Sequence, residues 1–195
     1  MQETAPAKTA PDVSEYAPYY GRYITLVGGE VVAALEDQPR ETLALLYPLS
    51  DEQGNYRYAP GKWSIKEMLG HLIDAERVFS CRALRFARND STPLPSFEQD
   101  DYVRSANFAD RRLTDLIEEF VCVRRATVWL FRTLSPEAWM RRGVASGNPV
   151  SVRAVAYIIA GHELHHRREL QDKYRSVMEE AGLMMSRLRP ESGRV

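Results

Sequence analysis

The stretch that decides the fold is GKWSIKEMLGHLIDAE at residues 61–76, where the clearest helix of the sequence begins. Ser64 and Glu67 fit a capping box, in which two side chains satisfy orphan amide donors of the first helical turn. Apolar residues then recur at the spacing of one helix face. They are Ile65, Met68, Leu72, Ala75, Phe79 and Phe86. The pattern predicts an amphipathic helix from Ser64 to about Arg88.

Three further segments have the same helical periodicity, at residues 30–49, 110–134 and 151–180. Pro39 either bends the first of them or starts a second part of it. The aromatic stretch at residues 16–26 favours a short leading helix. No segment alternates convincingly between apolar and polar residues, so no strand is expected. Four amphipathic helices predict an all-α fold, a four-helix bundle.

The remaining segments suggest one domain with two tails. Residues 1–15 are expected to form a flexible N-terminal tail, residues 16–181 the helical bundle, and residues 182–195 a basic, frayed C-terminal tail. The segment 89–107 is long enough to cross the bundle or to carry a short extra turn. The segment 142–149 contains two glycines and a proline and is expected to be a loop.

The composition is that of an ordinary globular protein, with 44% hydrophobic and 27% charged residues in a chain of 195. The net charge of -1 indicates neither a nucleic-acid footprint nor a polybasic membrane patch. The apolar runs are too short to span a bilayer. We expect a soluble, cytoplasmic protein that binds neither nucleic acid nor membrane. Cys81 and Cys122 lie in helical segments and are expected to be buried free thiols.

Three of the four histidines fall within GHELHH at residues 161–166. His162 and His166 are four residues apart, so their rings lie one above the other on the apolar face of the last helix. Two neutral imidazoles in a core need partners, which are a metal ion or ordinary hydrogen-bonding groups. His71 borders the apolar face of the helix at 64–88 and can meet this pair across the bundle. The three histidines predict a divalent-metal site with an open position for water or substrate.

The neighbouring polar residues have less specific patterns. His165 lies about 100° around the helix from His166, which favours a surface or supporting role. Asp74 shares the side of His71, where it either orients a ligand or is a solvated carboxylate. Residues 162–166 also satisfy the H-E-x-x-H signature of zinc proteases, with Glu163 as base. The absence of a downstream third ligand and of a strand for peptide binding argues against a peptidase, but Glu163 is still a candidate base.

Two stretches, GKWSIKEMLGHLIDAE at 61–76 and GHELHHR at 161–167, resemble the histidine motifs of the DinB/YfiT-like superfamily, in the same order. The resemblance covers about residues 19–174. It implies a four-helix bundle, commonly a homodimer, with a three-histidine site for zinc, nickel or a similar ion. The implied metal ligands are His71, His162 and His166. Many relatives continue with Arg-Gly-Gln where this chain has Arg167-Arg168-Glu169, so the role of that polar pair is open.

The resemblance implies a metal-dependent enzyme that acts on a small-molecule substrate. Some members resemble S-transferases that activate a low-molecular-weight thiol, and others are described as metal-dependent hydrolases. A bound ion lowers the pKa of a thiol in the first case and of water in the second. A metal-binding stress-response module without catalysis and a purely structural bundle are the other hypotheses. Ligand type alone does not select the metal, because imidazole suits zinc, nickel, copper and iron.

Overall fold

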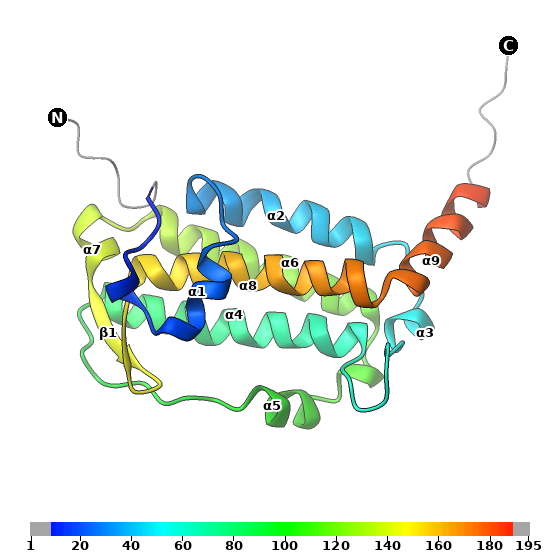
Figure 1. Cartoon of the computed structure of the whole chain (residues 1–195), viewed down its shortest axis with the longest axis horizontal. Coiled ribbons are helices and arrows are strands. Elements are labelled where there is room, and N and C mark those ends of the chain that lie inside the picture. The colour runs from blue at the N-terminus through cyan, green and yellow to red at the C-terminus, as the bar shows by residue number, and fades with distance from the viewer. Residues whose placement is uncertain (1–8, 189–195) are drawn as a thin grey trace, which may run out of the picture.

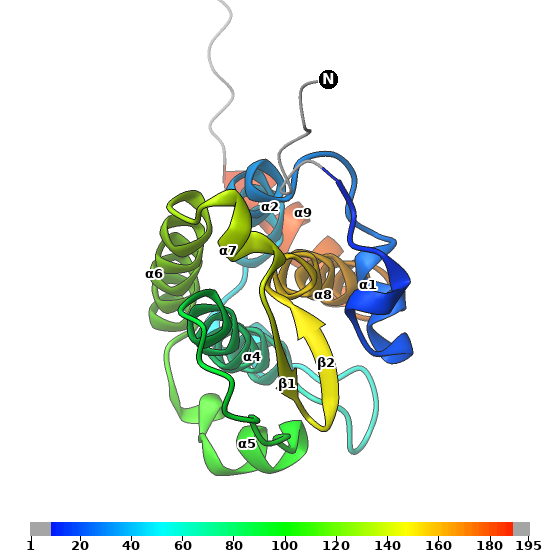
Figure 2. The same ribbon diagram turned by 90° about the vertical axis from the view of Figure 1, so that its left-hand side faces the viewer.

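The computed structural model describes residues 9–188, with side chains described for residues 9–182. Four long helices form a bundle (Figure 1), which confirms the predicted all-α, four-helix-bundle class. They are α2 (Val31–Leu46), α4 (Ile65–Ala87), α6 (Leu113–Arg132) and α8 (Val152–Lys173). Seen end-on, α2 and α4 occupy opposite corners, and each packs against both α6 and α8 (Figure 2).

Local side-chain bonds start two of these helices at the predicted residues. At α4 the Ser64 hydroxyl accepts a hydrogen bond from the Glu67 amide (3.2 Å), and the Glu67 carboxylate accepts one from the Ser64 amide (2.7 Å). At α8 the Ser151 hydroxyl accepts from the Ala154 amide at 2.9 Å. Pro39 lies inside the single helix α2 and does not start a second one.

The last predicted helix is interrupted at Tyr174, between α8 and α9 (Arg175–Leu188). The Tyr174 ring is buried, and its hydroxyl donates to the Trp63 carbonyl at 2.7 Å. This anchor fixes the point where α8 ends, and α9 leaves the bundle axis in Figure 1. The predicted C-terminal tail is therefore helical as far as Leu188, and residues 189–195 lie outside the described chain.

The N-terminal segment packs against α8 from before residue 16. A 3-10 turn, η2 (Val13–Glu15), buries the Glu15 carboxylate, which accepts from the Ser151 hydroxyl at 2.6 Å and pairs with Arg153. The predicted tail at 1–15 is thus wrong over its last residues, and residues 1–8 lie outside the described chain. The leading helix is short, with η3 (Pro18–Tyr20) followed by α1 (Gly21–Ile24).

A β-hairpin stands where the sequence predicted a loop. Strands β1 (Arg142–Ala145) and β2 (Asn148–Ser151) pair antiparallel at one end of the bundle (Figure 2). Ser146 and Gly147 join them with φ of 54° and 75°, the signs that a tight two-residue hairpin turn requires. Strands of four residues are too short to produce a visible alternation, which is why the prediction of no strand is wrong.

Shorter helices complete the chain. They are α3 (Asp51–Gly54), α5 (Gln99–Ser105), η4 (Phe108–Asp110) and α7 (Pro136–Met140). The segment after α4 thus carries the short extra helix that its length allowed. Cys81 and Cys122 are free but exposed, so the prediction of buried thiols is wrong. Among the described residues, no helix combines the length and apolar character needed to cross a membrane.

Candidate metal centre

Three imidazole rings meet at the interface between α4 and α8. The Nε2 atom of His162 lies 3.1 Å from Nε2 of His71 and 3.1 Å from Nε2 of His166. The residues His71, His162 and His166 are 3%, 7% and 7% exposed, respectively. The three residues that the sequence singled out are therefore brought together, with one nitrogen of each ring turned toward a common point.

The spacing and protonation of this cluster fit a divalent ion. Tetrahedral zinc with nitrogen ligands at about 2.0–2.1 Å holds those nitrogens about 3.3 Å apart, close to the observed separation. Burial and the neighbouring His166 lower the pKa of His71 to about 3. Burial likewise holds the pKa of His162 well below its usual range. The two imidazoles are neutral at pH 7, and neutral imidazole is the form that ligates metals.

Glu169 supports the cluster from the last turns of α8. Its carboxylate lies 2.9 Å from His166 Nδ1 and also pairs with Lys173. The hydrogen bond to His166 is the main reason that the pKa of Glu169 falls to about 2. A proton held on Nδ1 leaves the Nε2 lone pair of His166 directed at the other two rings. In the sequence, Glu169 was noted only because many relatives have a different residue at this position. Its place three residues after His166 was a further signal that it could contact that ring.

His165 and Asp74 lie outside the cluster of His71, His162 and His166. His165 is on the edge of the cluster, with Nε2 3.8 Å from the Glu169 carboxylate. Asp74 pairs with Arg77 at 3.6 Å, and its pKa is raised by burial. Among the described residues its carboxylate pairs with Arg77, one turn along α4, and has no hydrogen bond to a histidine.

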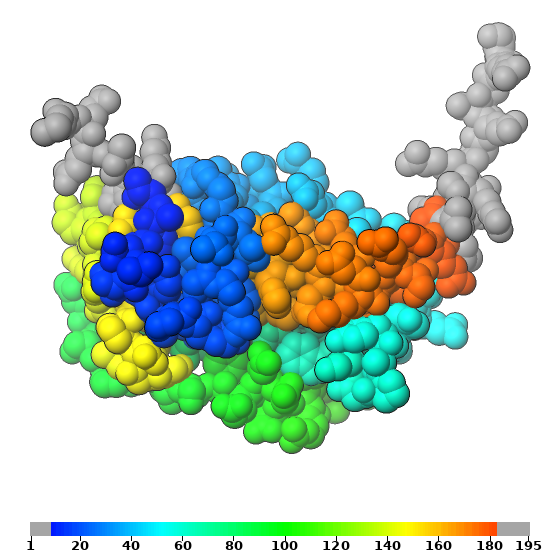
Figure 3. Space-filling model, viewed as in Figure 1, coloured from blue at the N-terminus to red at the C-terminus, as the bar shows by residue number. Residues whose placement is uncertain are grey.

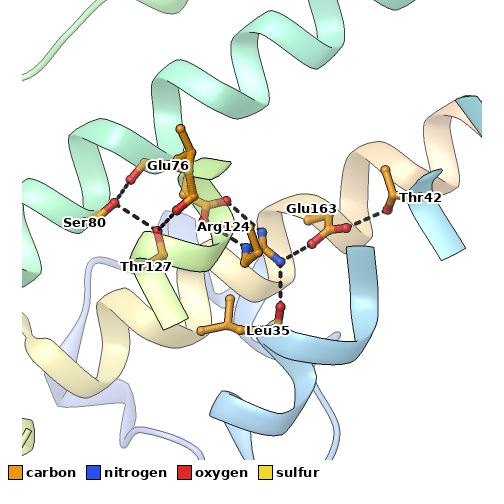
Figure 4. A network of polar contacts seen from close by, with 8 residues as sticks. Leu35, Thr42, Glu76, Ser80, Arg124, Thr127 and Glu163 are labelled. Atoms are coloured by element: carbon orange, nitrogen blue, oxygen red, sulfur yellow. Dashed lines mark hydrogen bonds and ion pairs between the residues drawn. The ribbon is translucent and has the colours of Figure 1, made fainter. Parts of the chain in front are cut away.

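Glu163 belongs to a separate buried network, in which its carboxylate is directed at Arg124 and Thr42 (Figure 4). Its carboxylate accepts from the Thr42 hydroxyl at 2.6 Å and from Arg124 at 2.5 Å. Arg124 also binds both oxygens of Glu76, at 2.9 and 2.8 Å. Neighbouring helix positions differ by about 100°, so the residue after His162 faces a different helix. Glu163 is therefore not the base that the H-E-x-x-H pattern suggested.

Two adjoining cavities reach the cluster and share part of their walls. One, of about 390 Å³, borders His165, His166 and Glu169. The other, of about 300 Å³, borders His71 and His162. Trp63 packs on the His71 ring and Tyr23 on the His162 ring, with centroid separations of 4.7 and 5.2 Å. In Figure 3 the N-terminal segment, α5, α8 and the loop before α4 come together on this face.

The N-terminal segment approaches α8 closely at Gly161, next to His162. A Cβ atom at Gly161 would lie 2.1 Å from the Tyr23 carbonyl oxygen, so a side chain here would push α1 away. Because Gly161 has no side chain, α1 can pack close to α8, and the Tyr23 ring contacts His162. Aromatic cover of this kind limits the access of water to the three histidines.

Both the sequence and the fold of this chain are similar to those of known proteins. The sequence model of the DinB superfamily matches residues 34–170, which include all three histidines. A protein of Geobacillus thermodenitrificans named "Putative metal-dependent hydrolase" is 24% identical over 147 residues, which cover 72% of this chain and 80% of the relative.

Two solved structures share the fold. YfiT from Bacillus subtilis, described as "a probable metal-dependent hydrolase with an unusual four-helix bundle topology", superposes with a TM-score of 0.65 at 14% identity over 92% of this chain and 94% of its own. A DinB-like protein of Bacillus subtilis, YjoA, gives 0.56 at 19% identity over 77% and 90%. With the superfamily match over most of the bundle, these likenesses lead to one conclusion: the chain belongs to the DinB superfamily.

Proposed function

We propose that this protein is a metal-dependent hydrolase of small molecules that holds one divalent ion, zinc or nickel, on His71, His162 and His166. The observation that carries the proposal is the convergence of three buried Nε2 atoms at ligand spacing. The name of the Geobacillus relative and the description of YfiT support the reaction class. An ion with three protein ligands keeps a further position for substrate or water, which is typical of catalytic sites.

Each group of the site has a defined task in this proposal. When bound, a divalent ion supplies Lewis-acid chemistry, since it polarises an oxygen of the substrate and lowers the pKa of water. Glu169 holds the Nδ1 proton of His166 and fixes that ring. Trp63 and Tyr23 cover two of the rings and exclude water from them. The two adjoining cavities provide space for a substrate next to the cluster.

A thiol-dependent S-transferase is the second candidate, and one observation favours it. Neither of the two carboxylates nearest the histidines along α8 is free to act as a base, because Glu163 is bound by Arg124 and Thr42 and Glu169 is bound by His166 and Lys173. A thiol ionises more readily than water, so a thiolate reaction depends less on a strong base. A low-molecular-weight thiol would then act as a second substrate.

Elemental analysis tests the metal site first. Protein purified without chelators or a histidine tag is expected to contain about one zinc or nickel ion per chain. The variants His71→Ala and His166→Ala are expected to lose it, whereas His165→Ala keeps it. A wild-type protein that takes up neither ion would refute the proposal.

Glu169→Gln tests the supporting hydrogen bond. Loss of such a partner typically weakens metal binding by about 10–100-fold. Competition with a chromogenic chelator measures the change, and Asp172→Asn, an exposed carboxylate on the same helix, is the matched control. Equal zinc affinity in Glu169→Gln and wild type would contradict the role given to Glu169.

Substrate panels separate the reaction classes. Turnover of esters or amides by the loaded protein without added thiol supports the hydrolase. Product that forms only with a thiol and an electrophile supports the S-transferase instead. Tight metal binding without product from either panel indicates the non-catalytic binding module.

A further inference from the structure

Arg82 is a buried cation without a carboxylate partner among the side chains of residues 9–182. It is 4% exposed, and its Nη2 donates to the Pro95 carbonyl at 2.7 Å and to the Ser146 hydroxyl at 3.2 Å. Both acceptors are neutral. Within the same residues, Nε and Nη1 form no hydrogen bond. Two of the three guanidinium nitrogens thus have no acceptor, and no carboxylate of the described residues neutralises the charge.

The guanidinium faces the same cavity of about 300 Å³ that His71 and His162 border. Arg82 follows His71 by eleven residues, which is three helical turns and ~16 Å along α4. Phe79 and Phe97 flank the guanidinium carbon, with ring centroids at 5.6 and 5.8 Å. The cavity thus has a histidine end, an aromatic middle and a cationic end.

The hairpin turn holds the cationic end in place. Ser146 adopts the left-handed conformation, where Asn or Gly is the usual residue of such a turn. Its amide donates to the Leu94 carbonyl at 3.0 Å, and its hydroxyl accepts from Arg82. The hydroxyl orients the guanidinium without neutralising it. A polar side chain at a conformationally costly position indicates that the orientation of Arg82 matters.

Two acidic residues of the α5 region also border this cavity. Glu98 and Asp100 are exposed, and neither forms an ion pair with Arg82. The described side chains therefore leave the positive charge of Arg82 for a ligand to neutralise.

We infer that Arg82 binds the anionic end of an elongated substrate, whose apolar middle lies along Phe79 and Phe97. The anionic group is a carboxylate, sulfonate or phosphate, which accept strong charge-assisted hydrogen bonds from arginine. The inference rests on the proposed function only for the other end of the substrate, which reacts at the three histidines.

Calorimetric titration with phenylalkanesulfonates of increasing chain length tests the anion site. Each sulfonate is compared with its neutral methyl sulfone, on metal-free and on zinc-loaded protein. Sulfonate is a weak metal ligand, so a preference for it reports on Arg82. Wild type is expected to bind the best sulfonate about tenfold or more tightly than the matched sulfone, in both forms of the protein.

Variants assign the preference to Arg82. Arg82→Met and Arg82→Gln are expected to bind sulfonate and sulfone alike, and Arg82→Lys to keep part of the preference. Arg85→Met, on the same helix but paired with Asp90 at 2.6 Å, is the matched control and keeps all of it. If wild type shows no preference at any chain length, or Arg82→Met retains it, the inference is wrong. If the protein never binds zinc but still prefers sulfonate over sulfone, the anion site is confirmed and the proposed metal centre is refuted.

Discussion

Two arginines of this bundle are almost equally buried, at 3% exposed for Arg124 and 4% for Arg82, but their surroundings differ. Arg124 binds two carboxylates and the Leu35 carbonyl, all within the chain (Figure 4). Arg82 binds one carbonyl and one hydroxyl and borders a cavity. Two arginines that are equally buried thus have different roles. Arg124, whose partners all belong to the chain, holds the helices together. Arg82, whose charge is incompletely matched, can bind a ligand.

The Arg124 network joins all four long helices at one level. Arg124 belongs to α6, Glu76 to α4 and Glu163 to α8, while Thr42 and the Leu35 carbonyl come from α2. Because Glu163 directly follows His162, the network also fixes the register of the helix that supplies two histidines. The predictions below test this difference between the two arginines, starting with the largest effect.

Arg124→Met is expected to lower the free energy of unfolding by about 3–5 kcal/mol, since it leaves two buried carboxylates without their counter-ion. Urea denaturation measures the loss. Replacement of the whole network, with Glu76→Leu and Glu163→Leu added, removes those charges and is expected to recover most of the stability. A loss below about 1 kcal/mol in Arg124→Met would show that the network does not hold the helices together.

Glu163→Gln is expected to cost about 2 kcal/mol, because the Arg124 contact loses its charge while Arg124 and Glu76 still balance each other. The metal content should stay at the wild-type value, since the Glu163 carboxylate is directed at Arg124 and Thr42. Denaturation and elemental analysis on the same sample check both statements. Full stability combined with lost metal would place Glu163 in the metal site after all.

Arg82→Met is expected to change the free energy of unfolding by less than about 1 kcal/mol, in either direction, because it removes an incompletely matched charge along with two hydrogen bonds. The same urea titration applies, with Arg124→Met as the contrasting variant. A loss as large as that of Arg124→Met would make Arg82 a structural residue and remove the difference between the two arginines.

Ser146→Asn is expected to have the smallest effect, a gain of about 0.5 kcal/mol, since Asn-Gly is the preferred pair of this type of turn. Thermal unfolding measures the gain. The preference for sulfonate over sulfone is expected to weaken, because the hydroxyl that orients Arg82 is gone. Unchanged sulfonate binding would indicate that Ser146 does not position the guanidinium.

The histidine cluster could be predicted because its signals are local. His162 and His166 share a helix face by spacing alone, and His71 borders the apolar face of a well-capped helix. The buried arginines were not predicted, because arginine is mostly a surface residue and a single charge in a helix looks solvated. Arg82 does follow Phe79 by three residues, so its place on the apolar face of α4 was a usable signal.

Tertiary contacts account for the elements that the sequence missed. The break at Tyr174 depends on a bond to Trp63, which lies far away in the chain. The hairpin strands pair with each other and bridge to Leu94, about fifty residues earlier in the chain, and their turn residues, Ser146 and Gly147, are not the Asn-Gly or Asp-Gly pair that marks such a turn most clearly. Burial of Glu15 depends on Ser151 and Arg153, so the packing of the N-terminal segment could not be inferred from its own composition.

The chain separation within the histidine cluster has a consequence for folding. His162 and His166 become neighbours as soon as one helix forms, but His71 is 91 residues from His162 and joins them only when α4 docks on α8. A ligand that needs all three rings therefore binds the native state and not the unfolded ensemble. Its binding free energy adds to the free energy of unfolding of the native state. An increase in stability at saturating ligand would therefore show that α4 has docked on α8.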